Sequence, residues 1–274
     1  GEPPASRPAA HAWKEIAPGM ELGQFPVKAP GGIGEATITI LRADPARWEL
    51  QLLGAGAEGG PSGLTAHDWG VTRGLAAVIN AGMFATDYRT HVGYMRSGGL
   101  VHNSRVAGSY HSVAAFGPTR PDLPEFRIFD LDVPGVTMDR ILADYASAVQ
   151  NLRLIKRPGE NRWPEQEKRW SEAALAEDDR ARVLFVHCRS PYSMHDFNEE
   201  LLGLDIGIVA AQHLEGGPEA QLYVAAGETR IELVGSYETA FREDDANRAA
   251  LPLPNVLGLR WRATPDPGGS GTSH

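Results

Sequence analysis

Residues 206–219 read Ile206-Gly207-Ile208-Val209-Ala210-Ala211-Gln212-His213-Leu214-Glu215-Gly216-Gly217-Pro218-Glu219. The apolar run predicts a buried strand that ends in a carboxylate, two glycines, a proline and a second carboxylate. Glycine permits backbone torsions that other residues avoid, and it lets the backbone approach a ligand closely. A tight turn with acidic side chains explains this segment equally well, so the rest of the chain must decide between a turn and a site.

The composition is that of a globular protein with an acidic balance. The chain has 274 residues, a formal net charge of -9, 42% hydrophobic residues and 22% charged residues, which is ordinary for a soluble domain. The acidic charge and the lack of a basic stripe argue against a nucleic-acid partner. No apolar run approaches the roughly 20 residues that a membrane helix needs, so we expect no membrane span. The single cysteine, Cys188, excludes an internal disulfide and a cysteine-based metal cluster.

The two ends of the chain differ in composition from the middle. Residues 1–12 are rich in Pro and Ala, and we predict a disordered leader left by removal of a signal peptide or a tag. Residues 265–274 predict a flexible tail. No repeat or linker divides residues 13–264, which we expect to form one domain. A secreted or periplasmic location in a bacterium is compatible with the leader and the lone cysteine.

Short runs of apolar and β-branched residues predict strands along most of the chain. They form hairpins and two strand–helix–strand units, while one charged, aperiodic segment predicts a long exposed loop. In chain order, these features are a hairpin over 37–53, a unit over 48–79, a hairpin over 92–102, the loop over 156–170, a unit over 183–214 and a hairpin over 222–234. We therefore predict the α+β class, with one mixed, twisted β-sheet, several hairpins, two β-α-β crossovers and short flanking helices.

The two crossovers predict where a site would form. A β-α-β unit makes its strands parallel, so their carboxyl ends lie on one edge of the sheet, and ligands bind beyond such ends. In the second unit this brings the segment after Val186 beside Glu215. If both units share one sheet edge, four side chains face one cleft: Asn80, Arg189, Glu215 and Glu219.

These residue types suit a sugar-phosphate ligand. Arginine binds phosphate through its planar fork, two carboxylates serve glycosidic cleavage, and a Gly-Gly turn can present N–H groups to an anion. Plainer interpretations remain open, because Arg189 could be an ion-pair partner and Glu219 a helix-start acid. The histidines show no spacing that supports a metal site, so we expect neither a metal nor a cofactor.

Five segments in order resemble the motifs of the phosphodiester glycosidase family, over residues about 35 to 260. They are Ile79-Asn80-Ala81-Gly82-Met83-Phe84 followed by Val92-Gly93-Tyr94, Gln150-Asn151-Leu152-Arg153-Leu154, Lys168-Arg169-Trp170-Ser171-Glu172-Ala173-Ala174-Leu175, His213-Leu214-Glu215-Gly216-Gly217, and Pro254-Asn255-Val256-Leu257-Gly258. The chain departs from the family where Glu215 replaces the usual aspartate and where Pro218 and Glu219 replace a glycine and a serine.

The resemblance implies hydrolysis of the bond between an anomeric carbon and a phosphate, as in an N-acetylglucosamine-1-phosphodiester. It implies a carbohydrate phosphodiester as substrate, and Glu215 as base or nucleophile. The other catalytic candidates are Asn80 for the sugar and Arg169 and Arg189 for the phosphate. The substrate-binding candidates are Gly82, Gln150, Asn151, Ser171, His187, Gly216, Gly217 and Glu219.

Two other classes of function stay open. A non-catalytic carbohydrate-binding module would explain an altered motif without turnover. A metal-dependent phosphodiesterase would cut the P–O bond instead, but the His and Asp clusters typical of such enzymes are not visible in the sequence. Binding without product would favour the first class, and inhibition by a chelator with release of sugar phosphate would favour the second.

Overall fold

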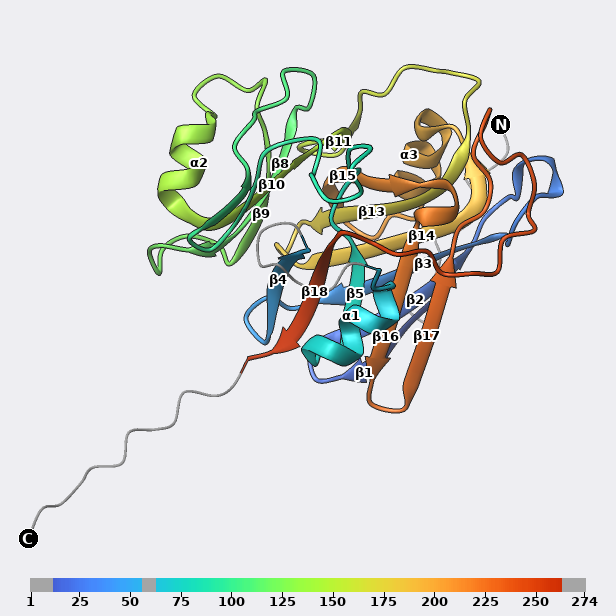
Figure 1. Cartoon of the computed structure of the whole chain (residues 1–274), viewed down its shortest axis with the longest axis horizontal. Helices are drawn as coiled ribbons and strands as arrows, with labels where there is room; N and C mark the ends of the chain where they lie inside the picture. The colour runs from blue at the N-terminus through green and yellow to red at the C-terminus, as the bar shows by residue number, and fades with distance from the viewer. Residues whose placement is uncertain (1–11, 56–62, 263–274) are drawn as a thin grey trace, which may run out of the picture.

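The computed structural model describes residues 12–55 and 63–262, and this part of the chain forms three β-sheets with three α-helices (Figure 1). The predicted leader, except for Ala12, and the predicted tail lie outside these residues. The coarse prediction of the α+β class is confirmed. No helix in the described ranges is long and apolar enough to cross a membrane.

The largest sheet has eight strands and contains Glu215 near the end of one of them. Its strand order is β1 (Trp13–Ala17), β2 (Met20–Pro26), β3 (Thr37–Ala43), β14 (Val183–Tyr192), β13 (Trp170–Asp178), β15 (Ile208–Gly216), β11 (Arg153–Lys156) and β12 (Glu160–Asn161). The central strands β14 and β13 are buried along nearly their whole length. Their apolar residues are continuous rather than alternating because both faces of the sheet are covered.

Two five-stranded sheets pack against the large sheet. One has the order β7 (Leu100–Asn103), β6 (Met95–Ser97), β10 (Tyr145–Asn151), β8 (Ser112–Pro118) and β9 (Phe126–Asp130). The other has the order β17 (Thr229–Val234), β16 (Gln221–Ala226), β5 (Ala77–Asn80), β18 (Asn255–Trp261) and β4 (Trp48–Gly54). The main core lies between the sheets and includes Leu41, Ile79 and Phe116.

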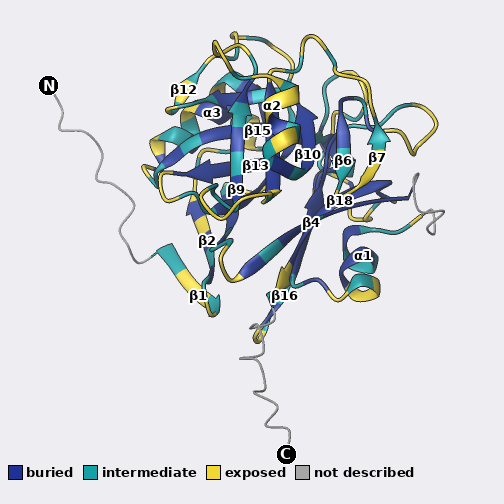
Figure 2. Ribbon diagram, turned by 90° about the vertical axis from the view of Figure 1, so that its left-hand side faces the viewer, coloured by how far each residue is buried: buried dark blue, intermediate teal, exposed yellow. Residues whose placement is uncertain are grey.

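Each helix covers the outer face of one sheet. They are α1 (Ala66–Arg73), α2 (Met138–Asp144) and α3 (Met194–Gly203). Trp69 of α1 packs on the β5 sheet, Ile141 of α2 on the β8 sheet, and Phe197 of α3 on the large sheet. Two of the helices, α1 and α3, begin at side-chain caps: the Thr65 hydroxyl accepts from the Asp68 N–H and the Ser193 hydroxyl accepts from the Asp196 N–H. Figure 2 shows the buried residues concentrated in the strands between these helices.

The predicted mixed sheet with parallel neighbours is wrong. Strand β18 lies between β4 and β5, and β13 lies between β14 and β15, each antiparallel to both neighbours. The two crossovers therefore join strands that run in the same direction but do not touch, and every strand pair among the described residues is antiparallel. A local strand–helix–strand pattern cannot reveal a strand inserted from elsewhere in the chain.

The predicted hairpin over residues 37–53 is also wrong. Strand β3 pairs with β2 and β14, whereas β4 pairs with β18, so the turn at 44–47 passes between two sheets. The β1–β2 hairpin before it was not predicted. The other two predicted hairpins are confirmed, as β6 with β7 and as β16 with β17, and β13 and β14 form a further hairpin. The predicted loop over 156–170 contains the short strand β12.

Candidate active site

An open cleft of about 320 Å³ lies at the end of β15. Three separate segments line it: the loop that follows β5, the end of β15 with the 3-10 turn Gly217–Glu219, and the turn after Tyr237. Three carboxylic side chains face this cleft, those of Glu215, Glu219 and Glu238. The strand pattern thus predicted the position of Glu215 and Glu219 together, and the structure adds Glu238 to them.

Glu215 projects from an irregular strand end. It lies opposite Ala173 of β13, and the register shifts between that pair and the next, Ala174 with His213. Its Oε1 atom accepts a hydrogen bond of 3.0 Å from the Gly216 N–H. The bulge bends the end of the strand, which turns this side chain toward the cleft.

The two glycines after Glu215 lie so close to neighbouring side chains that a larger residue would not fit at either position. A Cβ atom on Gly216 would lie 2.7 Å from Cδ1 of Trp170, and one on Gly217 would lie 2.6 Å from Oε2 of Glu238. Gly217 also has φ +67, a conformation that other residues rarely adopt. Gly216 therefore makes room for the Trp170 indole, and Gly217 makes room for the third carboxylate of the cleft.

The environment of the cleft favours protonated carboxyls. Burial is the main cause that raises the pKa of Glu215 to about 8, and the charges of Glu219 and Glu238 act in the same direction, against His213. Burial likewise raises the pKa of Glu219 and the pKa of Glu238. Glu215 is thus mostly protonated at neutral pH. No Lys or Arg lines the cleft, and no group of His, Cys, Asp and Glu within residues 12–55 and 63–262 has the geometry to hold a metal ion.

A buried ion pair lies behind the cleft. Nδ1 of His213 is 2.7 Å from Oε1 and 2.9 Å from Oε2 of Glu172. The Trp170 indole N–H donates a 2.6 Å hydrogen bond to the same carboxylate. Burial lowers the pKa of His213, but the Glu172 carboxylate outweighs it and the net direction is upward. The pair places a positive imidazolium near Glu215 and Glu238, where it opposes the rise in pKa of both.

Asn80 supports the cleft from behind. Its Nδ2 donates a 2.8 Å hydrogen bond to the Glu219 carbonyl, and its Oδ1 accepts one of 2.8 Å from the Gln221 N–H. Asn80 is buried at the end of β5. It therefore fixes the backbone that presents Glu219, and it does not line the cleft.

Contrary to the prediction, the cleft of Glu215 does not include Arg189, and His187 does not line it either. Both line a different cleft of about 330 Å³, because β14 continues to Tyr192 and does not end at Val186. Arg189 donates to the Asp245 carboxylate at 2.7 Å and to the carbonyls of Val234, Asp245 and Asn247 at 2.8–3.0 Å. His187 donates to the Ala220 carbonyl at 3.1 Å if its Nε2 carries the proton, and burial lowers its pKa to about 4.

Arg169 and Ser171 hold neighbouring segments in place. The Arg169 guanidinium lies over the Tyr237 ring at 5.4 Å, and the backbone of Arg169 bonds to Thr239 in the turn that presents Glu238. The buried Ser171 hydroxyl donates to the Arg189 carbonyl at 2.6 Å and accepts from the Ser236 N–H at 3.0 Å. Neither residue lines the cleft of Glu215.

Gln150, Asn151 and Gly82 shape the loops around the cleft. The Gln150 amide donates to the carbonyls of Ala107 and Tyr110 at 2.8 and 2.7 Å. The Asn151 amide donates at 2.9 Å to the Ala81 carbonyl and to Gln212. Gly82 has φ +150, and a Cβ atom there would collide with His91 and Asn151.

Sequence reasoning missed four residues at or near the cleft: Glu172, Glu238, Tyr88 and Phe241. Glu238 comes from a loop that only tertiary contacts bring here, through isolated bridges to Trp170 and Arg242, so no local pattern marks it. Glu172 had a usable signal, because it is a charged residue at the start of an otherwise apolar run in a buried strand.

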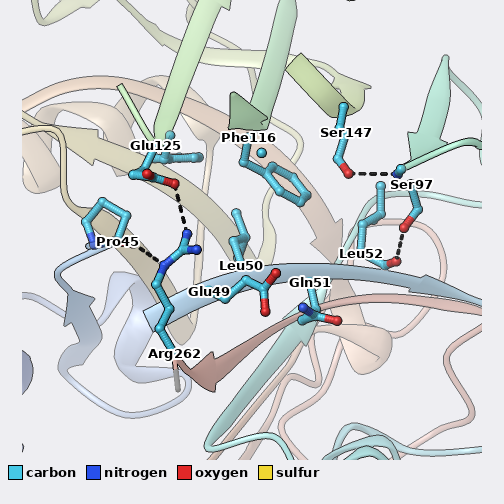
Figure 3. Close-up of a pocket in the computed structure, with 14 residues that line it drawn as sticks. Pro45, Glu49, Leu50, Gln51, Leu52, Ser97, Phe116, Glu125, Ser147 and Arg262 are labelled. Carbon is cyan, nitrogen blue, oxygen red and sulfur yellow. Dashed lines mark hydrogen bonds and ion pairs between the residues drawn. The ribbon is translucent and has the colours of Figure 1, made fainter. Parts of the chain in front are cut away.

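Another cleft, of about 280 Å³, lies between β4 and the β8 sheet (Figure 3). Arg262 spans its mouth, with 2.9 Å hydrogen bonds to the Pro45 carbonyl and to Glu125. Inside, the Ser97 hydroxyl donates to the Leu52 carbonyl at 2.7 Å. These contacts join the two sheets, and nothing in their geometry indicates a reaction.

The fold and the carboxylate cleft define an α+β protein with a polar site at the end of a strand. A family model described as phosphodiester glycosidase matches residues 73–260, and the chain belongs to this family. The resemblance seen in the five sequence motifs is thereby confirmed. No curated protein shows significant similarity to the chain.

Several solved structures share the fold. The zebrafish N-acetylglucosamine-1-phosphodiester alpha-N-acetylglucosaminidase catalytic domain, auto-inhibited by its pro-peptide, matches with a TM-score of 0.63 and 17% identity over 93% of this chain and 91% of that chain. A hypothetical protein from Synechocystis matches with a TM-score of 0.58 and 15% identity over 89% and 62%. A protein from Burkholderia pseudomallei described as exported matches with a TM-score of 0.51 and 12% identity over 81% and 73%. These structural matches show a common fold.

Proposed function

We propose that the chain is a hydrolase that cleaves the glycosidic C–O bond of a sugar-1-phosphodiester, with Glu215 as the general acid. The observation that supports this proposal best is that the Glu215 side chain faces a cleft shared with two more carboxyls, where burial raises its pKa to about 8. A carboxyl that stays protonated at neutral pH is suited to give a proton to a leaving oxygen. This assignment replaces the base or nucleophile role expected from the sequence.

The proposed reaction uses two carboxyls in different protonation states. The bond from the anomeric carbon to the phosphate oxygen breaks, its electron pair stays on that oxygen, and Glu215 supplies the proton. Glu219 or Glu238 acts on the other side of the sugar, as a base that takes a proton from water or as a nucleophile. In either case water finally adds its hydroxyl group to the anomeric carbon.

A negatively charged phosphodiester must enter a cleft lined by carboxyls. Protonation of Glu215 removes one repulsive charge and provides a donor for a phosphate oxygen. We propose Arg242 as the principal cation near the phosphate, because its charge already acts on the Glu219 carboxyl, where it opposes the rise in pKa that burial causes. Arg169, beside Tyr237, is a second candidate. We assign no phosphate contact to Arg189, since the protein occupies most of its N–H groups.

The relatives guide the choice of substrate and location. The zebrafish enzyme is named for an N-acetylglucosamine-1-phosphodiester, so we propose an N-acetylhexosamine or a related pyranose as the sugar. The likeness to a protein described as exported supports action outside the cytoplasm of a bacterium.

The test is hydrolysis of sugar-1-phosphodiesters, UDP-N-acetylglucosamine among them, in water enriched in oxygen-18, with and without EDTA. Mass spectrometry should find the label on the free sugar, because water attacks the anomeric carbon. Label on the phosphate would mean P–O cleavage and would overturn the proposal. Tight glycan binding without product would favour the carbohydrate-binding module instead.

A further inference from the structure

Two aromatic side chains at the cleft are unusually exposed. Tyr88 is 70% exposed and Phe241 is 71% exposed, and both line the cleft that contains Glu215. Large aromatic side chains are normally buried to a much greater extent. Among the described residues, Trp261 is the other exposed aromatic. Exposed apolar rings gathered at one cleft mark a binding surface rather than a chance feature of the fold.

The backbone that presents each ring adopts a conformation that side chains other than glycine rarely take. Tyr88 itself has φ 56, and Ala240, directly before Phe241, has φ 67. Such outliers persist where the surrounding structure imposes them, and they concentrate at functional sites. Both rings are therefore presented to the cleft by turns in which one residue has a strained backbone conformation.

The turn that presents Tyr88 is held by many hydrogen bonds. The Asp87 carboxylate accepts from the N–H groups of Arg89 and Thr90, each at 2.9 Å, and from the Thr90 hydroxyl at 2.5 Å. Phe84 supports the Tyr88 ring, with centroids 5.5 Å apart. The turn is thus held in place before a ligand arrives, which reduces the backbone entropy lost on binding.

The turn that presents Phe241 also presents a carboxyl of the cleft. Glu238 and Arg242 exchange backbone hydrogen bonds of 2.7 and 2.9 Å, and the Ala240 N–H donates to Glu243 at 2.9 Å. Phe241 and Glu238 therefore belong to one rigid unit. The cleft combines aromatic rings at its edge with hydrogen-bonding carboxyls inside it.

We propose that Tyr88 and Phe241 form a binding platform for a pyranose ring. One face of a pyranose consists of C–H groups, which are attracted to the electron-rich face of an aromatic ring. Its edge consists of hydroxyl groups, which match the acceptor oxygens of Glu215, Glu219 and Glu238. A purely apolar ligand such as an acyl chain would leave those carboxyls desolvated without partners. The platform rests on the proposed function for its location, and it adds the residues that recognise the sugar.

The test measures binding of two probes to the full-length chain by calorimetry: N-acetylglucosamine 1-phosphate and N,N′-diacetylchitobiose. Tyr88→Ala and Phe241→Ala should each weaken binding about five- to tenfold, and Tyr88→Phe should keep most of the affinity. Tyr88→Asn serves as a second variant, because Asn tolerates a positive φ. Val71→Ala, at a residue 63% exposed on α1, is the control and should leave binding unchanged.

Unchanged affinity in the Tyr88→Asn/Phe241→Ala double variant, or no binding of either probe to the wild-type chain, would overturn the platform. Measuring both binding and hydrolysis tests the platform separately from the proposed function. Aromatic-dependent binding without hydrolysis would support the platform and contradict the hydrolase. Hydrolysis with a KM that neither aromatic variant changes would support the hydrolase and contradict the platform.

Discussion

Nδ1 of His213 lies 2.7 Å from Oε1 of Glu172, in a pair whose side chains are 4% and 1% exposed and which lies directly behind the cleft of Glu215. Burial raises the pKa of Glu172, whereas His213 and the Trp170 indole N–H favour its charged form, so the proton of this pair lies between the carboxylate and the imidazole. Burial is the main cause of the raised pKa of Glu215, and the imidazolium opposes that rise, so loss of the pair should make Glu215 a weaker acid.

Glu172→Gln should shift the pH dependence of hydrolysis. Loss of the carboxylate lets burial lower the pKa of His213, so His213 becomes neutral and Glu215 loses a nearby positive charge. The pKa of Glu215 then rises, and the alkaline limb of the kcat/KM profile should move to higher pH. The free energy of unfolding should fall by about 3 kcal/mol.

Glu177→Gln is the matched control for Glu172→Gln. Glu177 is a second buried carboxylate of β13, and it pairs with Arg157 far from the cleft. The Glu177→Gln variant should be less stable than the wild-type chain, but its pH profile of kcat/KM should be unchanged. An unaltered profile in Glu172→Gln would show that the His213 pair does not act on Glu215.

The free energy of unfolding should fall as the pH rises, because the buried Glu215 carboxyl then loses its proton. Its pKa is about 8 in the folded chain and near 4.3 when unfolded, so the folded state binds more protons between these values. The contribution to stability is therefore complete below the unfolded pKa and is lost as the pH rises through about 8. The wild-type chain should lose up to about 1.4 kcal/mol per pH unit in this window relative to Glu215→Gln. Urea unfolding of both proteins from pH 5 to pH 9 measures the difference, and parallel curves would contradict the burial of an acid at this position.

Gly217→Ala should disable the cleft. The new methyl group would lie 2.6 Å from Oε2 of Glu238 in a backbone at φ +67. The strain should cost about 1–2 kcal/mol of stability, and the displaced Glu238 should lower kcat/KM. Gly98→Ala is the control, because Gly98 has φ +57 but no atom within 4 Å of its Cβ position. Equal activity in the two variants would mean that the Glu238 position does not matter.

Asn80→Ala should weaken both stability and activity. It removes the two hydrogen bonds of a buried side chain, to the Glu219 carbonyl and from the Gln221 N–H, which together contribute about 2 kcal/mol. The freed segment then presents Glu219 less rigidly. Asn198→Ala also removes two buried bonds, to the Leu154 carbonyl and Asn161, but on α3. Thermal unfolding should show similar losses, and kcat/KM should fall only in Asn80→Ala.

The sequence was most informative where local rules decide the structure. The run from Ile208 to Leu214 and the glycines after Glu215 correctly predicted a strand that ends at a carboxyl. Thr65 and Ser193 are also local signals, since an N-cap satisfies backbone donors within one turn, and α1 and α3 begin directly after them. The pairing of Glu215 with Glu219 in one cleft follows from the same short segment.

The rest depended on contacts between distant residues. Arg189 comes after an apolar run, but the strand continues past it, and its guanidinium is used by a loop some 50 residues away in the chain. Glu238 and Phe241 reach the cleft through a turn held by backbone contacts to Arg169. Such placements follow from strand insertion and from tertiary hydrogen bonds, which have no local sequence pattern.

The most direct test of Glu215 as the general acid is a pH profile of kcat/KM. It compares the wild-type chain with Glu215→Gln on a sugar-1-phosphodiester that the wild-type chain hydrolyses. We expect a wild-type alkaline limb near pH 8, where Glu215 loses its proton. Glu215→Gln should be about 10²–10⁴-fold slower and should lack that limb. Full activity in Glu215→Gln, or wild-type activity that rises as Glu215 deprotonates, would contradict its role as the general acid.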